Sequence, residues 1–82
     1  MSDTIEQKCL SKGVKLTDQR RIIAKVMSES TDHPNVDELY NRVSKLDSKI
    51  SIATVYRTVK LFEESGILTK HEFKGGKARY EE

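Results

Sequence analysis

The chain contains no tryptophan, one proline and a single cysteine among its 82 residues. A lone cysteine cannot form a disulfide within the chain and cannot build a zinc site by itself. No apolar run approaches the roughly 20 residues that a membrane-spanning helix needs, and the first residues, MSDTIEQK, lack the regions of a secretory signal. We therefore expect a cytoplasmic location without a membrane partner, and one small domain spanning residues 1–82.

Carboxylates are scarce in three particular stretches, although charged residues make up 34% of the chain and the net charge is only +2. Residues 8–25 hold six cations and one acid, residues 49–60 hold three cations and no acid, and residues 70–79 hold four cations and one acid. Each stretch alone could be an ordinary solvated surface. Three such stretches in one small domain favour a polyanionic partner.

Four segments show apolar residues at helical spacing. The first covers residues 3–12 and places Ile5, Cys9 and Leu10 on one face, with Gly13 suited to the end of the helix. This pattern predicts that Cys9 is a small core side chain rather than a reactive thiol.

Capping residues predict where the second and third helices begin. Thr17 can cap the second helix, whose apolar stripe comprises Ile22, Ile23, Val26 and Met27. Asn35 can cap the third, and Glu38 completes a pattern similar to a capping box. The apolar face of this third helix comprises Val36, Leu39, Tyr40, Val43 and Leu46.

The fourth segment should begin after Ser51 and end near Ser65, just before Gly66. Its β-branched residues favour a strand, whereas its length and spacing favour a helix, and we predict the helix. The expected core side comprises Ile52, Val55, Val59 and Phe62. A second stripe, without carboxylates, comprises Ala53, Tyr56, Arg57 and Lys60.

The remaining residues differ in pattern. Residues 67–73 and 77–81 are strand-like and flank the sequence KGG, which indicates a β-hairpin with a glycine turn. The predicted fold is therefore mainly α with a small β-hairpin. This order matches a winged helix, in which a helix-turn-helix core of three to four helices carries a two-stranded wing.

The carboxylate-free stripe of the fourth helix suits the major groove of DNA, because the phosphates on either side would repel an acid. Tyr56 offers an apolar ring to a thymine methyl group, and Arg57 can donate two hydrogen bonds to guanine. Small Ala53 permits close approach, and Ser51 and Thr54 suit a phosphate. The sequence predicts sequence-specific binding of double-stranded DNA, with further contacts from Lys60 and, in the wing, Lys77.

Other interpretations remain open for these residues. Tyr56 could flank the core, Arg57 could pair with a surface acid, and the wing lysines could only solubilise the hairpin. A winged helix can also bind another protein, although the fourth helix offers only Tyr56 as an anchor. An enzyme is not expected, because no nucleophile and base lie together and no glycine-rich phosphate loop precedes a helix.

The sequence resembles the N-terminal DNA-binding domain of the ferric uptake regulator family, from about Gly13 to Glu81, in the stretches KLTDQRRIIAKVM, DELY, ISIATVYRTVKLFEESGIL and F-x-GGK-A-x-YE. The resemblance implies a bacterial, metal-responsive transcription repressor, usually of iron-uptake genes, that binds an A/T-rich palindromic operator as a dimer. It places Tyr56 and Arg57 in the major groove and Lys15 in the minor groove, where a narrow A/T-rich duplex attracts a cation. The T-x-x-R element adds Thr17 and Arg20 to the expected DNA-binding residues.

The same resemblance implies an incomplete metal site. The family's sensing site commonly takes one His and one Glu from this half, and His33 and Glu81 stand at the matching positions. Asp32 stands where some relatives have a second His, and His71 has no such match. The family's C-terminal domain, absent from this chain, would supply homodimerisation and most ligands, so this domain alone should hold Fe²⁺, Mn²⁺ or Zn²⁺ only weakly. Without the resemblance, His33 would be interpreted as a loop histidine.

Overall fold

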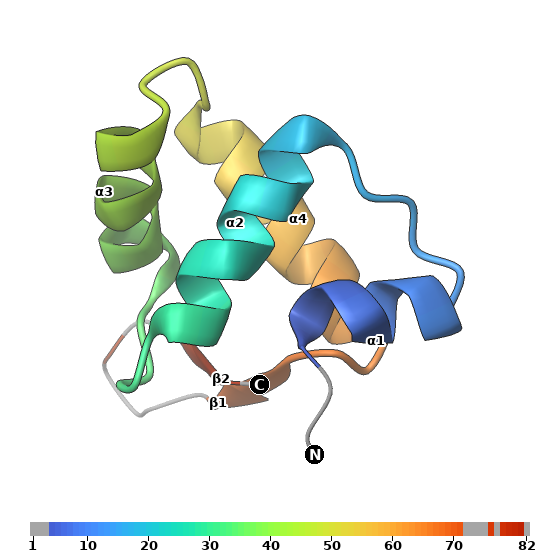
Figure 1. The fold of residues 1–82 in the computed structure, drawn as a ribbon. Helices are drawn as coiled ribbons and strands as arrows, with labels where there is room; N and C mark the ends of the chain where they lie inside the picture. The colour runs from blue at the N-terminus through green and yellow to red at the C-terminus, as the bar shows by residue number, and fades with distance from the viewer. Residues whose placement is uncertain (1–3, 72–75, 77, 82) are drawn as a thin grey trace.

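The helices and strands follow the order predicted from the sequence. The computed structural model describes residues 4–71, 76 and 78–81. Its elements are α1 (Ile5–Ser11), α2 (Asp18–Glu29), α3 (Val36–Leu46), α4 (Ile52–Glu64), β1 (Thr69–His71) and β2 (Arg79–Glu81). Figure 1 shows α2, α3 and α4 packed together above the hairpin, with α1 beside the lower ends of α2 and α4. The winged-helix fold is thereby confirmed.

All four helices begin at a polar side chain that caps the first turn. The side chains of Thr4, Thr17, Asn35 and Ser51 each accept a hydrogen bond from the backbone amide three residues further on. Such a cap contributes about 1 kcal/mol to helix stability. Gly66 follows α4 with a φ of +76°, a left-handed conformation that suits glycine. The predicted starts of α2, α3 and α4 and the predicted end of α4 are therefore confirmed.

The core is built by one face of each helix and by the residues that lead into the wing. Phe62 has the largest of the fully buried side chains. Cys9 is also fully buried, and burial raises the pKa of its thiol, which confirms its predicted core position. The other buried apolar side chains are Ile5, Ile23, Ala24, Val26, Met27, Leu39, Val43, Ile50, Val55, Val59, Ile67, Leu68 and Tyr80.

Three residues predicted to face the core are exposed instead. Leu10 is 77% exposed, Leu46 62% and Ile52 45%. Each lies in the last or first turn of its helix, where the neighbouring elements no longer lie opposite the apolar stripe. Conversely, Thr58 is buried on α4 although the sequence pattern did not assign it to the core. Among the described residues, no helix is long and apolar enough to cross a bilayer.

The wing is a short antiparallel hairpin attached to the helices along one edge. Thr69 pairs with Glu81 and His71 pairs with Arg79, which places Lys70 opposite Tyr80. The Tyr80 amide donates to the Pro34 carbonyl oxygen at 3.1 Å. Strand β2 therefore has β1 on one side and the loop between α2 and α3 (residues 30–35) on the other. The glycine turn predicted between the strands falls largely outside the described residues.

Candidate nucleic-acid interface

The outer face of α4 carries the stripe predicted to contact DNA. Its four residues, Ala53, Tyr56, Arg57 and Lys60, are all exposed. The first turn of α4 contains no acid, and the only acids of the helix lie at its C-terminal end, Glu63 and Glu64. The predicted outward orientation is confirmed. Contact of these residues with DNA stays a prediction.

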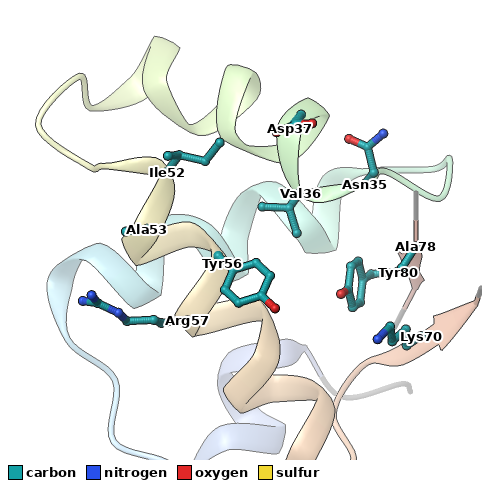
Figure 2. Close-up of a pocket in the computed structure, with 10 residues that line it drawn as sticks. All are labelled: Asn35, Val36, Asp37, Ile52, Ala53, Tyr56, Arg57, Lys70, Ala78 and Tyr80. Carbon is teal, nitrogen blue, oxygen red and sulfur yellow. The ribbon is translucent and has the colours of Figure 1, made fainter. Parts of the chain in front are cut away.

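A groove of about 710 Å³ runs between α4, the start of α3 and the hairpin. Its lining includes Ile52, Tyr56, Ala78 and Tyr80 (Figure 2). In Figure 2 the ring of Tyr56 extends from α4 toward the hairpin, whereas Arg57 points away from it. The helix therefore presents an aromatic ring on its wing side, whereas Arg57, which also lines the groove, extends its guanidinium group in the other direction. Tyr56, 53% exposed, flanks the groove rather than the core.

Two hydroxyl groups lie together at the start of α4. Ser51 Oγ accepts a hydrogen bond from the Thr54 amide at 3.1 Å and lies 3.1 Å from Thr54 Oγ1. Ser51 is exposed and Thr54 is partly exposed. Hydroxyls at a helix N-terminus suit an anion, because the amides of the first turn point in the same direction. The predicted phosphate contact is compatible with this geometry and stays a prediction.

The T-x-x-R element organises the turn before α2. Thr17 caps the helix by accepting a hydrogen bond from the Arg20 amide at 3.2 Å. The Arg20 side chain donates from Nη1 to the Lys15 carbonyl oxygen at 2.8 Å. Thr17 and Arg20 thus hold the backbone that carries the exposed Lys15 side chain. Lys77, the predicted contact in the wing, lies outside the described residues.

The two predicted metal ligands meet between the loop of residues 30–35 and β2. His33 Nε2 lies 3.0 Å from Glu81 Oε2. His71, which sequence reasoning did not assign to the site, lies 2.6 Å from the other oxygen, Glu81 Oε1. The imidazole rings of His33 and His71 stack with their centroids 5.8 Å apart. The hydrogen bond with His71 holds the pKa of the Glu81 carboxyl below its ordinary value, and the charges of both histidines act in the same direction.

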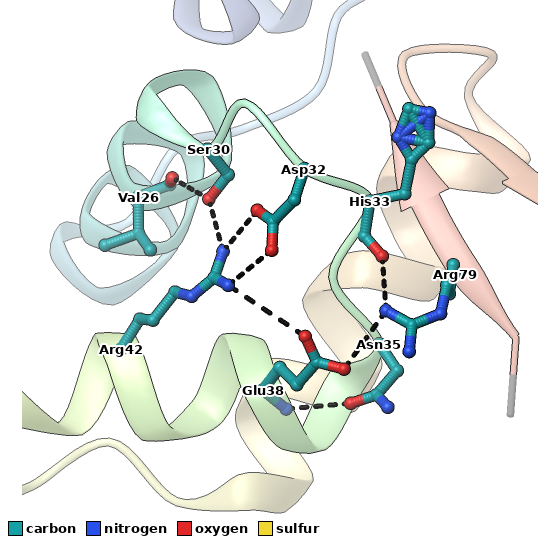
Figure 3. Close-up of polar contacts among 8 residues, drawn as sticks. All are labelled: Val26, Ser30, Asp32, His33, Asn35, Glu38, Arg42 and Arg79. Atoms are coloured by element: carbon teal, nitrogen blue, oxygen red, sulfur yellow. Dashed lines mark hydrogen bonds and ion pairs between the residues drawn. The ribbon is translucent and has the colours of Figure 1, made fainter.

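Asp32 has a different partner. Arg42 donates to Asp32 through both ends of its guanidinium, at 2.8 Å to Oδ1 and 2.6 Å to Oδ2 (Figure 3). This hydrogen bonding lowers the pKa of Asp32 to about 2. The Asp32 carboxylate is therefore bound to Arg42 of α3, although Asp32 is next in the chain to the predicted metal ligand His33.

Comparison with known proteins decides the family. The model of the ferric uptake regulator family matches residues 11–82. The chain belongs to this family.

Its relatives include the ferric uptake regulation protein of Rhizobium leguminosarum bv. viciae, 53% identical over 81 residues. That alignment covers 99% of the chain and 57% of the relative. The corresponding protein of Escherichia coli K12 is 39% identical over 70 residues, covering 84% of the chain and 47% of the relative. The chain thus spans about half the length of these relatives.

Solved members of the ferric uptake regulator family share the fold. A manganese uptake regulator superposes with a TM-score of 0.92 at 52% identity, covering 99% of this chain and 60% of that one. The ferric uptake regulator of Pseudomonas aeruginosa with manganese gives a TM-score of 0.85 at 26% identity. That superposition covers 96% of this chain and 60% of the Pseudomonas chain. These relatives are regulators rather than enzymes, as predicted. Because members are named for manganese as well as for iron, the family does not single out iron for this chain.

The metal-ligand pair fits the chemistry of the metals seen in relatives, but only in part. Imidazole nitrogen and carboxylate oxygen are donors that Zn²⁺, Mn²⁺ and Fe²⁺ accept. Among residues 4–71, 76 and 78–81, no group of three or more His, Cys, Asp or Glu side chains is arranged to hold a metal ion. His33 and Glu81 could therefore form one part of a ligand set. His71 lies beside His33 and Glu81 because of the register of β1 on β2, which places His71 and Glu81 at diagonal positions on the paired strands.

The pairing of Asp32 with Arg42 predicts a change of stability in acid. Because folding lowers the pKa of Asp32 from 3.8 to about 2, its contribution is complete above the higher value and is lost as pH falls through the lower one. We expect Asp32→Asn to remove this part of the acid destabilisation between about pH 4 and pH 2. Urea unfolding of the wild type and Asp32→Asn across this pH range measures the change in the free energy of unfolding. Arg42→Gln should remove the same pH-dependent contribution, because it removes the partner of Asp32. Identical pH profiles for wild type and Asp32→Asn would contradict the assignment.

Proposed function

We propose that this chain is the DNA-reading domain of a metal-responsive bacterial transcription repressor that acts in the cytoplasm. The observation that carries the proposal is the outer face of α4, which exposes Tyr56 and Arg57 and has no carboxylate until the helix ends. A helix with this face can enter the major groove without repulsion from the phosphates. The groove beside Tyr56 leaves the aromatic ring accessible from the wing side.

The other basic segments would anchor the same duplex. Lys15, held in its turn by Arg20, would reach the minor groove of an A/T-rich operator. Ser51 and Thr54 would bind a phosphate at the start of α4. Lys60 and Lys77 would add phosphate contacts on either side of the helix. These contacts carry little sequence information and would set the position of α4 on the DNA.

Metal regulation would use His33 and Glu81 as two ligands of a divalent cation, which could be Fe²⁺, Mn²⁺ or Zn²⁺. A metal bound there would fix the loop of residues 30–35 against the wing. The remaining ligands, and the contacts of a homodimer, would come from the portion of the relatives that this chain does not span. A dimer on a palindrome would gain affinity because the second half-site binds at high effective concentration.

Salt dependence of DNA binding tests the proposal. If the chain neutralises about four phosphates, the logarithm of its binding constant should fall with the logarithm of salt concentration at a slope of about −3.6. Fluorescence anisotropy of a labelled A/T-rich duplex, measured between about 50 and 200 mM salt, gives the slope. Saturable binding to an acidic protein, without duplex binding at low salt, would instead support the alternative of a protein-interaction module.

A further inference from the structure

The wing is attached to the loop of residues 30–35 by three successive residues of β2. Arg79 Nη1 donates to the His33 carbonyl oxygen at 2.9 Å, and the Tyr80 amide donates to the Pro34 carbonyl oxygen at 3.1 Å. Glu81 Oε2 lies 3.0 Å from His33 Nε2. Strand β2 is therefore joined to this loop by one backbone hydrogen bond and two side-chain contacts.

Glu38 connects this attachment to α3. Its Oε1 lies 3.1 Å from Arg79 Nη1, and its Oε2 lies 3.9 Å from Arg42 Nη2. Arg42 in turn binds Asp32, so positive and negative side chains alternate from the loop across α3 to the wing (Figure 3). Glu38 is itself well placed, because its amide donates at 2.8 Å to the side chain of Asn35, the cap of α3.

The wing needs such an attachment because it is small. Each described strand has three residues, and an isolated two-stranded hairpin is marginally stable in water. The buried residues Ile67 and Leu68 attach the start of β1 to the end of α4. The buried ring of Tyr80 and the polar contacts along β2 attach the other strand. A wing that moved freely would have to be ordered on binding DNA, which lowers affinity.

We propose that Glu38 is a positioning residue for DNA binding, which acts through Arg79 to hold the wing at a fixed place relative to α4. The inference rests on the proposed function and adds a role for a carboxylate that is not among the predicted DNA contacts. Helix α3 packs directly on α4 (Figure 1), so a wing bound to Glu38 is also fixed to the recognition helix.

The sign of the effect separates positioning from electrostatics. Removal of an acid close to a polyanion should strengthen binding if charge alone mattered. Loss of a positioning contact should weaken binding. Arg79→Lys offers a second test, because lysine keeps the charge but its shorter side chain does not place a nitrogen where Nη1 of Arg79 contacts both His33 and Glu38. A direct phosphate contact by Arg79 would largely survive that change.

The experiment compares Glu38→Ala, Arg79→Lys and the double variant with a matched control, Glu64→Ala, which removes an exposed acid at the far end of α4. Affinity for a duplex is measured at fixed salt, and exchange of the Tyr80 amide proton is measured by NMR without DNA.

The Glu38–Arg79 pair is partly exposed. Its side chains are 36% and 41% accessible, so each single change should weaken DNA binding about two- to fivefold. The double variant should lose little more than either single variant.

In Glu38→Ala and Arg79→Lys, the Tyr80 amide should exchange faster while the Val59 amide in the core exchanges as before. Glu64→Ala should bind DNA as well as the wild type or better. Binding by Glu38→Ala that equals or exceeds the wild type, or unaltered Tyr80 exchange, would overturn the positioning role. A wild-type chain that bound no duplex would overturn the proposed function as well, so the two failures can be distinguished.

Discussion

Arg57→Ala is expected to remove most of the preference of this chain for its selected duplex over a scrambled one. Arg57 is exposed on α4, and among the described residues its side chain makes no hydrogen bond or ion pair. It is therefore available for the two hydrogen bonds that guanine accepts in the major groove. One such contact discriminates by about 1–3 kcal/mol, so the ratio of the two affinities should fall about 5- to 150-fold.

Competition binding with both duplexes measures this ratio. Lys60→Ala is the matched control, since Lys60 lies on the same exposed stripe of α4. A lysine that contacts a phosphate carries no base information, so its loss should weaken binding to both duplexes equally. If Arg57→Ala also weakened both equally, Arg57 would be a phosphate contact and the assignment of base recognition would be wrong.

Phe62→Ala is expected to destabilise the fold more than a change at any predicted DNA contact. Phe62 is fully buried where α4 faces the other helices. Truncation of a buried phenylalanine costs about 3–5 kcal/mol, because apolar contacts are lost and a cavity remains. The whole domain should have a stability of roughly 4–12 kcal/mol at the usual value per residue. The variant should therefore lose at least about a quarter of the stability of the domain, and it should be unfolded at 25 °C if the wild type lies at the lower end of this range.

Urea unfolding followed by helical circular dichroism measures the change. Tyr56→Ala is the control, because Tyr56 is an aromatic residue of the same helix that is 53% exposed. Its removal should change the free energy of unfolding by about 0.5 kcal/mol or less, while DNA affinity falls. Equal destabilisation by the two variants would show that α4 does not have separate core and outer faces.

Local signals in the sequence account for most of the fold. Thr17, Asn35 and Ser51 act within one helical turn, so their capping positions were predictable and are confirmed. The faces of α4 were also predictable, since helical periodicity separates Val55 from Tyr56 whatever surrounds them. Apart from buried Thr58 in the middle of α4, the errors occurred at the ends of helices. Burial there depends on which element lies opposite, and periodicity does not contain that information.

The candidate site was less predictable, because its contacts join segments far apart in the chain. His33 and Glu81 were named only through family resemblance, and the structure brings them together. His71 was missed, because its contact with Glu81 follows from the register of β1 on β2. Arg79 was counted only as a charge, although it bridges the loop and α3. The exact register of the strands would have been needed to predict the contacts of both His71 and Arg79.

The central claim is that the outer face of α4 recognises DNA sequence. Selection from a pool of random duplexes by this 82-residue chain, at low and at moderate salt, tests it most directly. We predict enrichment of one A/T-rich motif with a guanine at a constant position, which persists at the higher salt concentration. A pool that stays random under both conditions, while the chain remains folded, would contradict the claim.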